Sequence, residues 1–270
     1  LDLTVAGSYS LGGDLSRSFS GGTSLTVSFN SASGQLTLAQ NGAVIYVGGD
    51  FSLRRHSTSG VNGLKIAQAR ESGNPYPGDL SFQAVRQSSG NYKLYVIAHV
   101  YIEDYLYGVV PYEMGNSSNV EALKAQAVAA RTRAVRQQRD GGCSRHPGAD
   151  ICGDSACCQG YVGETACRDK WGGEFEFYRK RVMQAVLETK DELLRYDGEP
   201  ITVLYHAMSG GRTEDAQAVF SQSLPYLVSV DSTGEESARG FYTDTAFSYE
   251  EAAQLLNGHF RGLNLTAQQL

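Results

Sequence analysis

The sequence lacks the long apolar runs and the basic stripes that mark two large classes of protein. Its 270 residues contain no run of about 18 apolar residues, which is roughly the length that a membrane-spanning helix needs. Lys and Arg number 23 against 29 Asp and Glu, and the basic residues do not gather into a stripe. Because nucleic-acid interfaces are basic patches, we expect no nucleic acid among the partners of this chain.

The chain also has no initiator methionine, no secretory leader and no internal repeat. It starts at Leu1, and a leader or an anchor removed upstream would leave no trace in it. The composition, 41% apolar and 19% charged, is that of an ordinary globular protein. A chain of this length forms one large domain or two modest ones around a hydrophobic core.

Dispersed cysteine pairs are absent as well. The cysteines all lie within 25 residues, at Cys143, Cys152, Cys157, Cys158 and Cys167. An odd number cannot pair completely within one chain, and a tight cluster beside a histidine favours a metal site over a disulfide framework. The alternatives are a disulfide, buried thiols, and a Cys–His nucleophile pair of the peptidase type, although no family signature surrounds any of these cysteines.

The first half of the chain carries strand signals followed by one strong helix signal. Alternating polar and β-forming residues predict short antiparallel strands over residues 1 to about 60, and a further strand over residues 91–103. A dense run of helix formers predicts a helix with Ser118 as its N-cap and Glu121 completing a capping box. This helix is expected to end near Gln138.

The second half begins with a loop and returns to mixed structure. A loop rich in Cys and Gly is expected to run to about Gly173, before a second helix over residues 174–189. The dipeptide Asp197-Gly198 predicts a hairpin turn, with its second strand over residues 201–207.

A last short helix is expected over residues 249–256, with Ser248 and Glu251 as its capping box. Strands and helices are segregated along the chain and do not alternate strictly, which favours an α+β fold. We expect antiparallel strands plus a few helices, arranged as two lobes. Residues 1–75 are expected to be an N-terminal β-rich part of the same unit as residues 76–270.

Several separate motifs match one protein family in the same order. They are residues 105–114 (YLYGVVPYEM), 121–132 (EALKAQAVAART), 158–163 (CQGYVG), 205–213 (YHAMSGGRT) and 224–227 (LPYL). Through them the region from about residue 77 to 232 resembles the stage II sporulation protein D family, which includes enhancers of cell-wall amidases. The first 75 residues carry little of this resemblance.

The resemblance implies a peptidoglycan lytic transglycosylase, which cleaves the bond between N-acetylmuramic acid and N-acetylglucosamine. It also implies that residues 76–270 are the catalytic region and that the two expected lobes flank a glycan-binding cleft. Such an enzyme works with one acidic residue, which by resemblance is Glu113. The acid protonates the leaving glycosidic oxygen, and its carboxylate then helps the muramic 6-hydroxyl attack to give a 1,6-anhydro end. The alternative is that Glu113 only pairs with a nearby base.

Lys124 and Arg131 also match family positions and are expected to bind substrate or to order Glu113. They are seven residues apart and therefore share one face of a helix. The alternative is an exposed basic face without a ligand.

The stretch Ser209-Gly210-Gly211 is expected to follow a strand and to expose backbone N–H groups to a sugar. By resemblance it lies beside the cleft together with Tyr205 and Thr213, which completes the expected substrate-binding set. The alternative is a plain turn.

Some members of the family bind zinc in the cysteine-rich loop, and His146, Cys152 and Cys158 match that pattern. Cys157 is the expected fourth ligand, with Cys143 in reserve, since four N/S ligands suit tetrahedral Zn²⁺. Four protein ligands close the site, which implies a structural metal.

Family membership further implies partners and a location. The expected partners are peptidoglycan glycan strands without stem peptides, a cell-wall amidase and other proteins of sporulation engulfment. A wall enzyme acts outside the cytoplasm, so the parent protein is expected to be membrane-anchored or exported. A different class of function is also open, in which the chain is a non-catalytic peptidoglycan-binding enhancer of an amidase.

Overall fold

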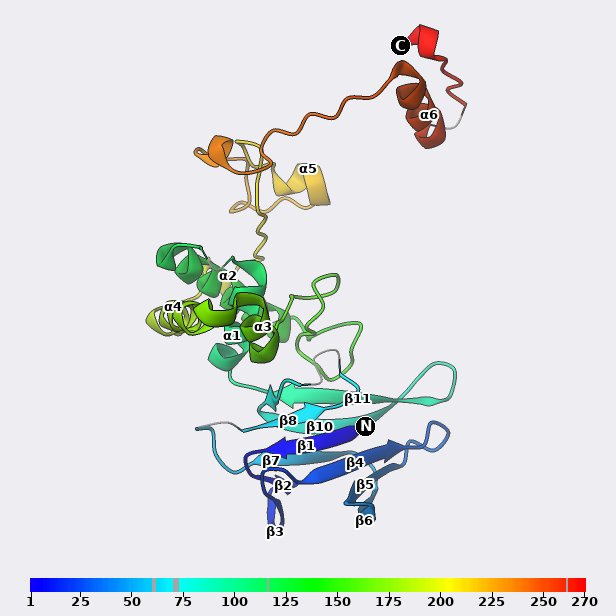
Figure 1. Cartoon of the computed structure of the whole chain (residues 1–270), viewed down its shortest axis with the longest axis vertical. Coiled ribbons are helices and arrows are strands. Elements are labelled where there is room, and N and C mark those ends of the chain that lie inside the picture. The colour runs from blue at the N-terminus through cyan, green and yellow to red at the C-terminus, as the bar shows by residue number, and fades with distance from the viewer. Residues whose placement is uncertain (60–61, 70–72, 116, 261) are drawn as a thin grey trace. The chain divides into compact units, whose positions relative to one another are not determined.

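The computed structural model describes residues 1–59, 62–69, 73–115, 117–260 and 262–270 (Figure 1). The chain divides into two compact units, Leu1–Val203 and Leu204–Leu270, which we describe one at a time. Antiparallel strands come first and helices follow, so the expected α+β class is confirmed. Within the described residues, no helix is both long enough and apolar enough to cross a membrane.

The first unit opens with two antiparallel sheets. Their strands are β1 (Asp2–Ala6), β2 (Tyr9–Leu11), β3 (Asp14–Phe19), β4 (Ser24–Phe29), β5 (Leu36–Gln40), β6 (Ala43–Gly48), β7 (Phe51–Arg55), β8 (Gly63–Ile66), β9 (Tyr76–Pro77), β10 (Asp79–Arg86) and β11 (Tyr92–His99). The strand orders are β6-β5-β4-β1-β8-β9 and β11-β10-β7-β2-β3. The short antiparallel strands predicted over the first 60 residues are therefore confirmed in the described part of that region.

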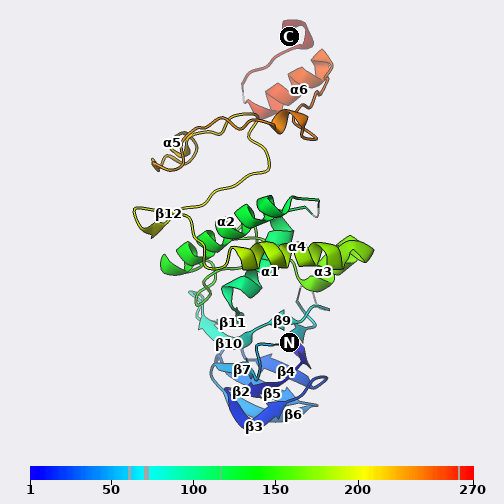
Figure 2. The same ribbon diagram turned by 90° about the vertical axis from the view of Figure 1, so that its left-hand side faces the viewer.

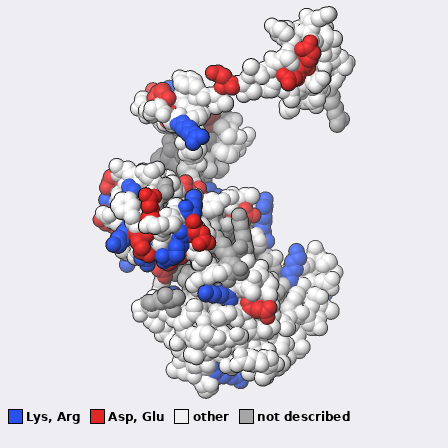
Figure 3. All heavy atoms as spheres, in the orientation of Figure 1, with Lys and Arg blue, Asp and Glu red and all other residues white. Residues whose placement is uncertain are grey.

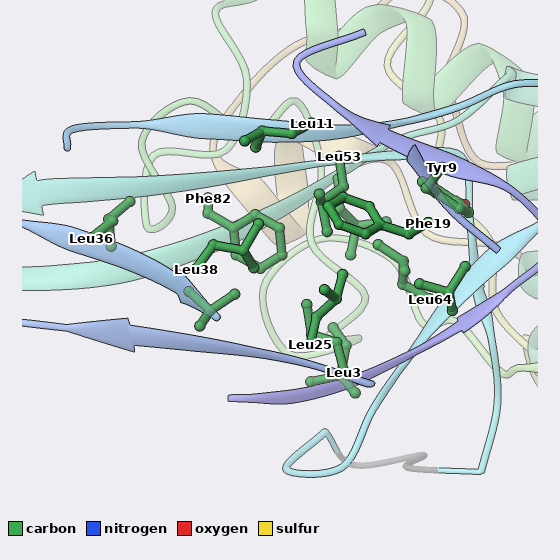
Figure 4. Close-up of a cluster of buried hydrophobic side chains, with 14 residues drawn as sticks. Leu3, Tyr9, Leu11, Phe19, Leu25, Leu36, Leu38, Leu53, Leu64 and Phe82 are labelled. Carbon is green, nitrogen blue, oxygen red and sulfur yellow. The ribbon is translucent and has the colours of Figure 1, made fainter. Parts of the chain in front are cut away.

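The period of two in the sequence builds the core between these sheets. In β1 and β4 the apolar residues alternate with exposed polar ones, so every second side chain turns inward. Leu25, Leu53 and Phe82 from different strands meet in this core and are almost fully buried (Figure 4). Phe82 also stacks on Phe51, with 4.9 Å between ring centroids.

A group of helices follows in the same unit: α1 (Ile102–Glu113), α2 (Val120–Arg139), α3 (Glu164–Trp171) and α4 (Phe175–Glu188). α1, α2 and α4 pack together around a second apolar core (Figure 2). Its buried members include Leu106, Val110, Leu123, Ala127 and Val186. Acidic and basic side chains crowd the surface of these helices, whereas the visible face of the β part carries few (Figure 3).

Three local expectations near α1 and α2 need correction. The strand predicted over residues 91–103 ends at His99, and α1 begins at Ile102, where Glu103 and Asp104 in the first turn suit the helix dipole. The N-cap of α2 is Asn119 and not Ser118, because the Asn119 side chain accepts the Glu121 N–H at 3.0 Å. α2 ends at Arg139, one residue beyond the predicted end.

The loop expected up to Gly173 contains a helix that was not predicted, α3. Its N-cap is Gly163, which has no side chain to mark a helix start. Cys167 and Trp171 on α3 instead pack against Phe175 of α4, so tertiary contacts stabilise a helix without local signals. α4 covers residues 175–188 of the predicted 174–189.

The hairpin predicted at Asp197-Gly198 is confirmed between β12 (Arg195–Tyr196) and β13 (Glu199–Pro200). Asp197 and Gly198 both have positive φ, as a two-residue hairpin turn requires. The second strand is wrong, because residues 201–207 form no strand. The chain is held just before this segment, where Arg136 of α2 donates to the Pro200 carbonyl at 2.8 Å.

The second unit contains α5 (Ala216–Phe220) and α6 (Tyr249–His259). The predicted capping box of α6 is confirmed: Ser248 and Glu251 each accept the backbone N–H of the other. The helix continues to His259, three residues beyond the predicted end.

Candidate functional site

Glu113 is the last residue of α1 and is half-buried. The helix is anchored by Leu106, Val109 and Val110, which are fully buried against α2 and α4. The N–H of Met114 still donates to the Val110 carbonyl at 2.9 Å, so the backbone around Glu113 is held by the last helical turn. A carboxyl group in this place is half-shielded from water and stands on a rigid element.

Lys124 lies on α2 between two carboxylates. Its Nζ is 2.8 Å from Glu121 Oε1 and 2.7 Å from Glu188 Oε2, which comes from α4. The hydrogen bonds with Glu121 and then Glu188 raise the pKa of Lys124, so the side chain is a cation at any physiological pH. A substrate anion would therefore meet this ammonium group in competition with two carboxylates of the chain.

Arg131 occupies the same side of α2 but is buried, with only 1% of the residue exposed. Its Nε and Nη2 donate to the two Glu103 carboxylate oxygens, at 3.0 and 2.7 Å. Nη2 also donates to the Val186 carbonyl at 3.1 Å. The alternative of an exposed basic face is therefore wrong for Arg131, whose guanidinium group ties α2 to α1 and α4.

Five candidate metal ligands of the cysteine-rich loop come together in the structure. The ligand atoms of Cys143, His146, Cys152 and Cys157 all lie within 4.8 Å of one another. The Cys158 thiol adjoins this set, 3.4 Å from Cys143 Sγ and 3.7 Å from Cys157 Sγ. Cys143, the reserve candidate, thus stands at the centre of the cluster.

Within this thiol cluster the pKa values of Cys143 and Cys157 are shifted in opposite directions. Burial raises the pKa of Cys143, but hydrogen bonds from His146 and Cys158 outweigh it and bring the pKa to about 6. The hydrogen bond with Cys152, followed by burial, raises the pKa of Cys157 to about 12. Because neighbouring thiolates repel one another, only a nearby cation allows several of these sulfurs to ionise together.

These distances fit a tetrahedral metal ion. With Zn–S bonds of about 2.3 Å, two thiolates on one tetrahedral zinc lie about 3.8 Å apart. Cys143 and Cys157 are 3.6 Å apart, and Cys143 Sγ is 3.3 Å from His146 Nδ1. No disulfide joins any of the cysteines, all of which are described. The cluster can therefore hold a metal ion.

The remaining expected binding residues lie in the second unit, where the Ser209-Gly-Gly stretch holds a carboxylate. The backbone N–H groups of Ser209 and Gly211 donate to Glu235 Oε2 at 2.9 and 3.1 Å, and the Ser209 hydroxyl donates to the same atom at 2.9 Å. Positive φ at Gly210 and Gly211 turns this backbone. The Ser232 hydroxyl and these groups lower the pKa of Glu235 to about 2.

Thr213 is bound nearby within the same unit. Its N–H donates to the Val230 carbonyl at 2.8 Å, and Tyr205 is half-buried four residues before Ser209. The expected strand before Ser209 is absent, as described above. Sequence reasoning missed Glu235 and Glu103, since neither has a local pattern that points to its distant partner.

Part of this chain is similar to proteins of known families. Residues 90–196 match the family model described as Stage II sporulation protein. Stage II sporulation protein D of Bacillus amyloliquefaciens is 31% identical over 172 residues, which are 64% of this chain and 50% of that protein. Stage II sporulation protein D of Bacillus subtilis strain 168 is 32% identical over 160 residues, covering 59% and 47% respectively.

A protein named amidase enhancer, also from Bacillus subtilis strain 168, is 34% identical over 128 residues, which are 47% of this chain and 15% of that protein. The chain spans about half the length of the two sporulation proteins that it matches. The segment that matches the family model, residues 90–196, contains Glu113, Lys124, Arg131 and the thiol cluster, and it ends before Tyr205.

Proposed function

Because the chain belongs to the stage II sporulation protein D family through residues 90–196, we propose that it acts on the bacterial cell wall during sporulation. Within that role it is a lytic transglycosylase that cleaves between N-acetylmuramic acid and N-acetylglucosamine. The observation that carries this proposal is Glu113, a half-buried carboxyl group at the end of a well-packed helix inside the matched segment.

Glu113 performs both proton transfers of the reaction. As an acid it protonates the glycosidic oxygen that leaves. As a carboxylate it then accepts the proton of the muramic 6-hydroxyl, which attacks the anomeric carbon and closes a 1,6-anhydro ring. The attacking hydroxyl belongs to the substrate, so proximity replaces the second carboxylate that activates water in most hydrolases.

Lys124 and Arg131 take different parts in this proposal. Lys124 keeps the expected role, in which its ammonium group binds glycan oxygens at the surface of α2. Arg131 is buried, and its role is to hold α1 and α4 against α2 through Glu103 and the Val186 carbonyl, so it does not keep the expected role of binding substrate. In the second unit, taken by itself, Tyr205, Ser209, Gly210, Gly211 and Thr213 keep their expected role as glycan-binding groups, in which a sugar competes with Glu235 for the Ser209 and Gly211 N–H groups.

The thiol cluster binds one structural zinc ion. Cys143, His146, Cys152 and Cys157 supply the ligand atoms, and Cys158 adjoins them. A set of thiolates and imidazole suits zinc better than magnesium or calcium, which prefer oxygen ligands. The ion adds stability to a loop that has little core of its own, since binding energy in a folded site becomes folding energy.

The proposed setting is extracytoplasmic. The substrate is peptidoglycan glycan without stem peptides, and the parent protein is exported or anchored. Similarity to an amidase enhancer supports a cell-wall amidase as a partner, alongside other engulfment proteins. The same similarity is the reason to test a non-catalytic role, in which Glu113 only grips the sugar.

The test uses purified, stem-peptide-free glycan strands with and without a purified cell-wall amidase. The full chain alone is expected to shorten the strands and to produce 1,6-anhydro ends, which mass spectrometry detects as a loss of one water relative to hydrolysis. Unchanged strands together with faster release of peptides by the amidase would make the chain an enhancer and not an enzyme.

A further inference from the structure

The CQGYVG motif interlocks with α1 through two pairs of glycine and tyrosine. The ring of Tyr161 fills the space beside Gly108 on α1, and a Cβ atom built on Gly108 would overlap that ring. In the same way the ring of Tyr112 fills the space beside Gly160, where a Cβ atom would overlap it. α1 and the CQGYVG motif therefore each supply one tyrosine ring and one glycine that leaves room for the ring of the other segment.

Hydrogen bonds fix the two segments further. The Tyr105 hydroxyl donates to Gln159 Oε1 at 3.0 Å, and Gln159 is only 2% exposed. The Val162 N–H donates to the Gly108 carbonyl at 3.0 Å. Because Tyr105, Gly108 and Tyr112 recur at the spacing of one helix face, the whole face of α1 lies against this loop segment.

Tyr112, one of the two tyrosines in these contacts, directly precedes Glu113 in the sequence. Its hydroxyl is 3.1 Å from Ser155 Oγ, and its ring is held at Gly160. Both contacts come from the loop that carries the thiol cluster, since Ser155 lies between Cys152 and Cys157. The last turn of a helix frays when nothing holds it, and Tyr112 is held on two sides.

We propose that Gly160 and Ser155 are positioning residues for Glu113, acting through the ring and hydroxyl of Tyr112. This inference rests on the proposed function, in which Glu113 is the acid. Gly160 sets how closely α1 approaches the loop, and Ser155 fixes where the Tyr112 hydroxyl lies. The direction of the Glu113 side chain follows from both, because the two residues share one peptide unit.

The first test compares Gly160→Ala with Gly115→Ala in the full chain. The added methyl group at Gly160 meets the Tyr112 ring, whereas at Gly115 it meets nothing within 4 Å. A displacement of about 1 Å at a catalytic group costs on the order of 100-fold in rate. We expect Gly160→Ala to lower kcat on glycan strands about 10- to 100-fold with KM nearly unchanged, and Gly115→Ala to keep the wild-type kcat. A wild-type kcat for Gly160→Ala would overturn the inference.

The second test avoids any change of shape. Tyr112→Phe and Ser155→Ala remove the same hydrogen bond from opposite sides. Each is expected to lower kcat a few-fold, and the double variant is expected to match the single variants, since residues that act through one contact are not additive. Independent effects that multiply in the double variant would contradict a shared role.

The third test does not depend on cleavage. Hydrogen–deuterium exchange of the backbone at residues 110–115 reports the order of the last turn of α1. Faster exchange there in Gly160→Ala, with wild-type exchange in Gly115→Ala, supports the positioning role even if the wild-type chain cuts no glycan. In that case only the proposed function would fail, while equal exchange in both variants would remove the positioning role itself.

Discussion

Arg131 shows how one residue acquires a role that its sequence context does not reveal. Its spacing from Lys124 placed both on one face of α2, and that is how they lie, since both reach residues of α4. What the spacing did not show is burial. Arg131 reaches inward to Glu103, which lies 28 residues earlier on α1, and no pattern in the sequence links the two.

Removing the Arg131 guanidinium group should be strongly destabilising. Arg131→Ala leaves the carboxylate of Glu103 without its partner, with only 15% of that side chain exposed. Breaking a buried ion pair from one side costs about 3–5 kcal/mol. Urea unfolding should therefore show a loss of that order, and Arg131→Met with Glu103→Leu should recover much of it. A wild-type free energy of unfolding for Arg131→Ala would show that the ion pair with Glu103 does not stabilise the fold.

The lowered pKa of Glu235 predicts that the stability of the second unit depends on pH. Its pKa falls from 4.5 to about 2 in the folded chain because the Ser232 hydroxyl and the Ser209-Gly-Gly stretch bind the carboxylate. A depressed pKa contributes stability above the unfolded value, and this contribution is lost as pH falls from about 4.5 through 2. Carbon-detected NMR titration should show the Glu235 carboxyl group titrating near pH 2, and a midpoint near 4.5 would rule out the contact.

Among the helices and turns, sequence patterns correctly predicted the features that depend only on neighbouring residues. The capping box of α6 and the Asp197-Gly198 turn rest on neighbouring residues, and both are confirmed. α3 has a glycine N-cap and depends on Trp171 packing against α4, so its sequence gave no start signal. Residues 201–207 are apolar enough for a strand, but among the described residues no partner strand pairs with them.

The start of α2 offers a matched test of one correction. Asn119→Ala removes the side chain that accepts the Glu121 N–H, and loss of such a cap costs about 1 kcal/mol. Ser118→Ala changes the neighbouring residue without touching that hydrogen bond. We expect only Asn119→Ala to lower the free energy of unfolding, measured in denaturant. Equal losses in the two variants would mean that Ser118 also caps the helix.

The cysteine-rich loop should behave as a metal-stapled element. Elemental analysis is expected to find about one zinc per chain, and Cys143→Ser and Cys152→Ser are both expected to lose it and to lower the melting temperature. Cys167→Ser is the matched control, because Cys167 packs on α3 outside the ligand set. Wild-type metal content in Cys143→Ser would restore Cys158 as the fourth ligand.

At the scale of the whole molecule, the expected site residues fall in two compact units. Glu113, Lys124 and the thiol cluster belong to the unit that contains the family match, and the Ser209-Gly-Gly stretch belongs to the other. Motif order assigned all of these residues to one region, residues 76–270, and did not predict this division. Side-chain partners between distant segments, such as Tyr112 with Gly160, become visible only in the folded chain.

If Glu113 is the acid that cuts glycan strands, Glu113→Gln should abolish the cutting. The amide keeps the size of the side chain but cannot donate the proton, and loss of general acid catalysis costs at least 10²–10⁴-fold in rate, an order-of-magnitude range. The measurement is mass spectrometry of 1,6-anhydro ends from stem-peptide-free strands, with equal amounts of the folded wild type and variant. We expect abundant anhydro ends from the wild type and almost none from Glu113→Gln, which still binds the strands. Anhydro ends formed at the wild-type rate by Glu113→Gln would contradict it.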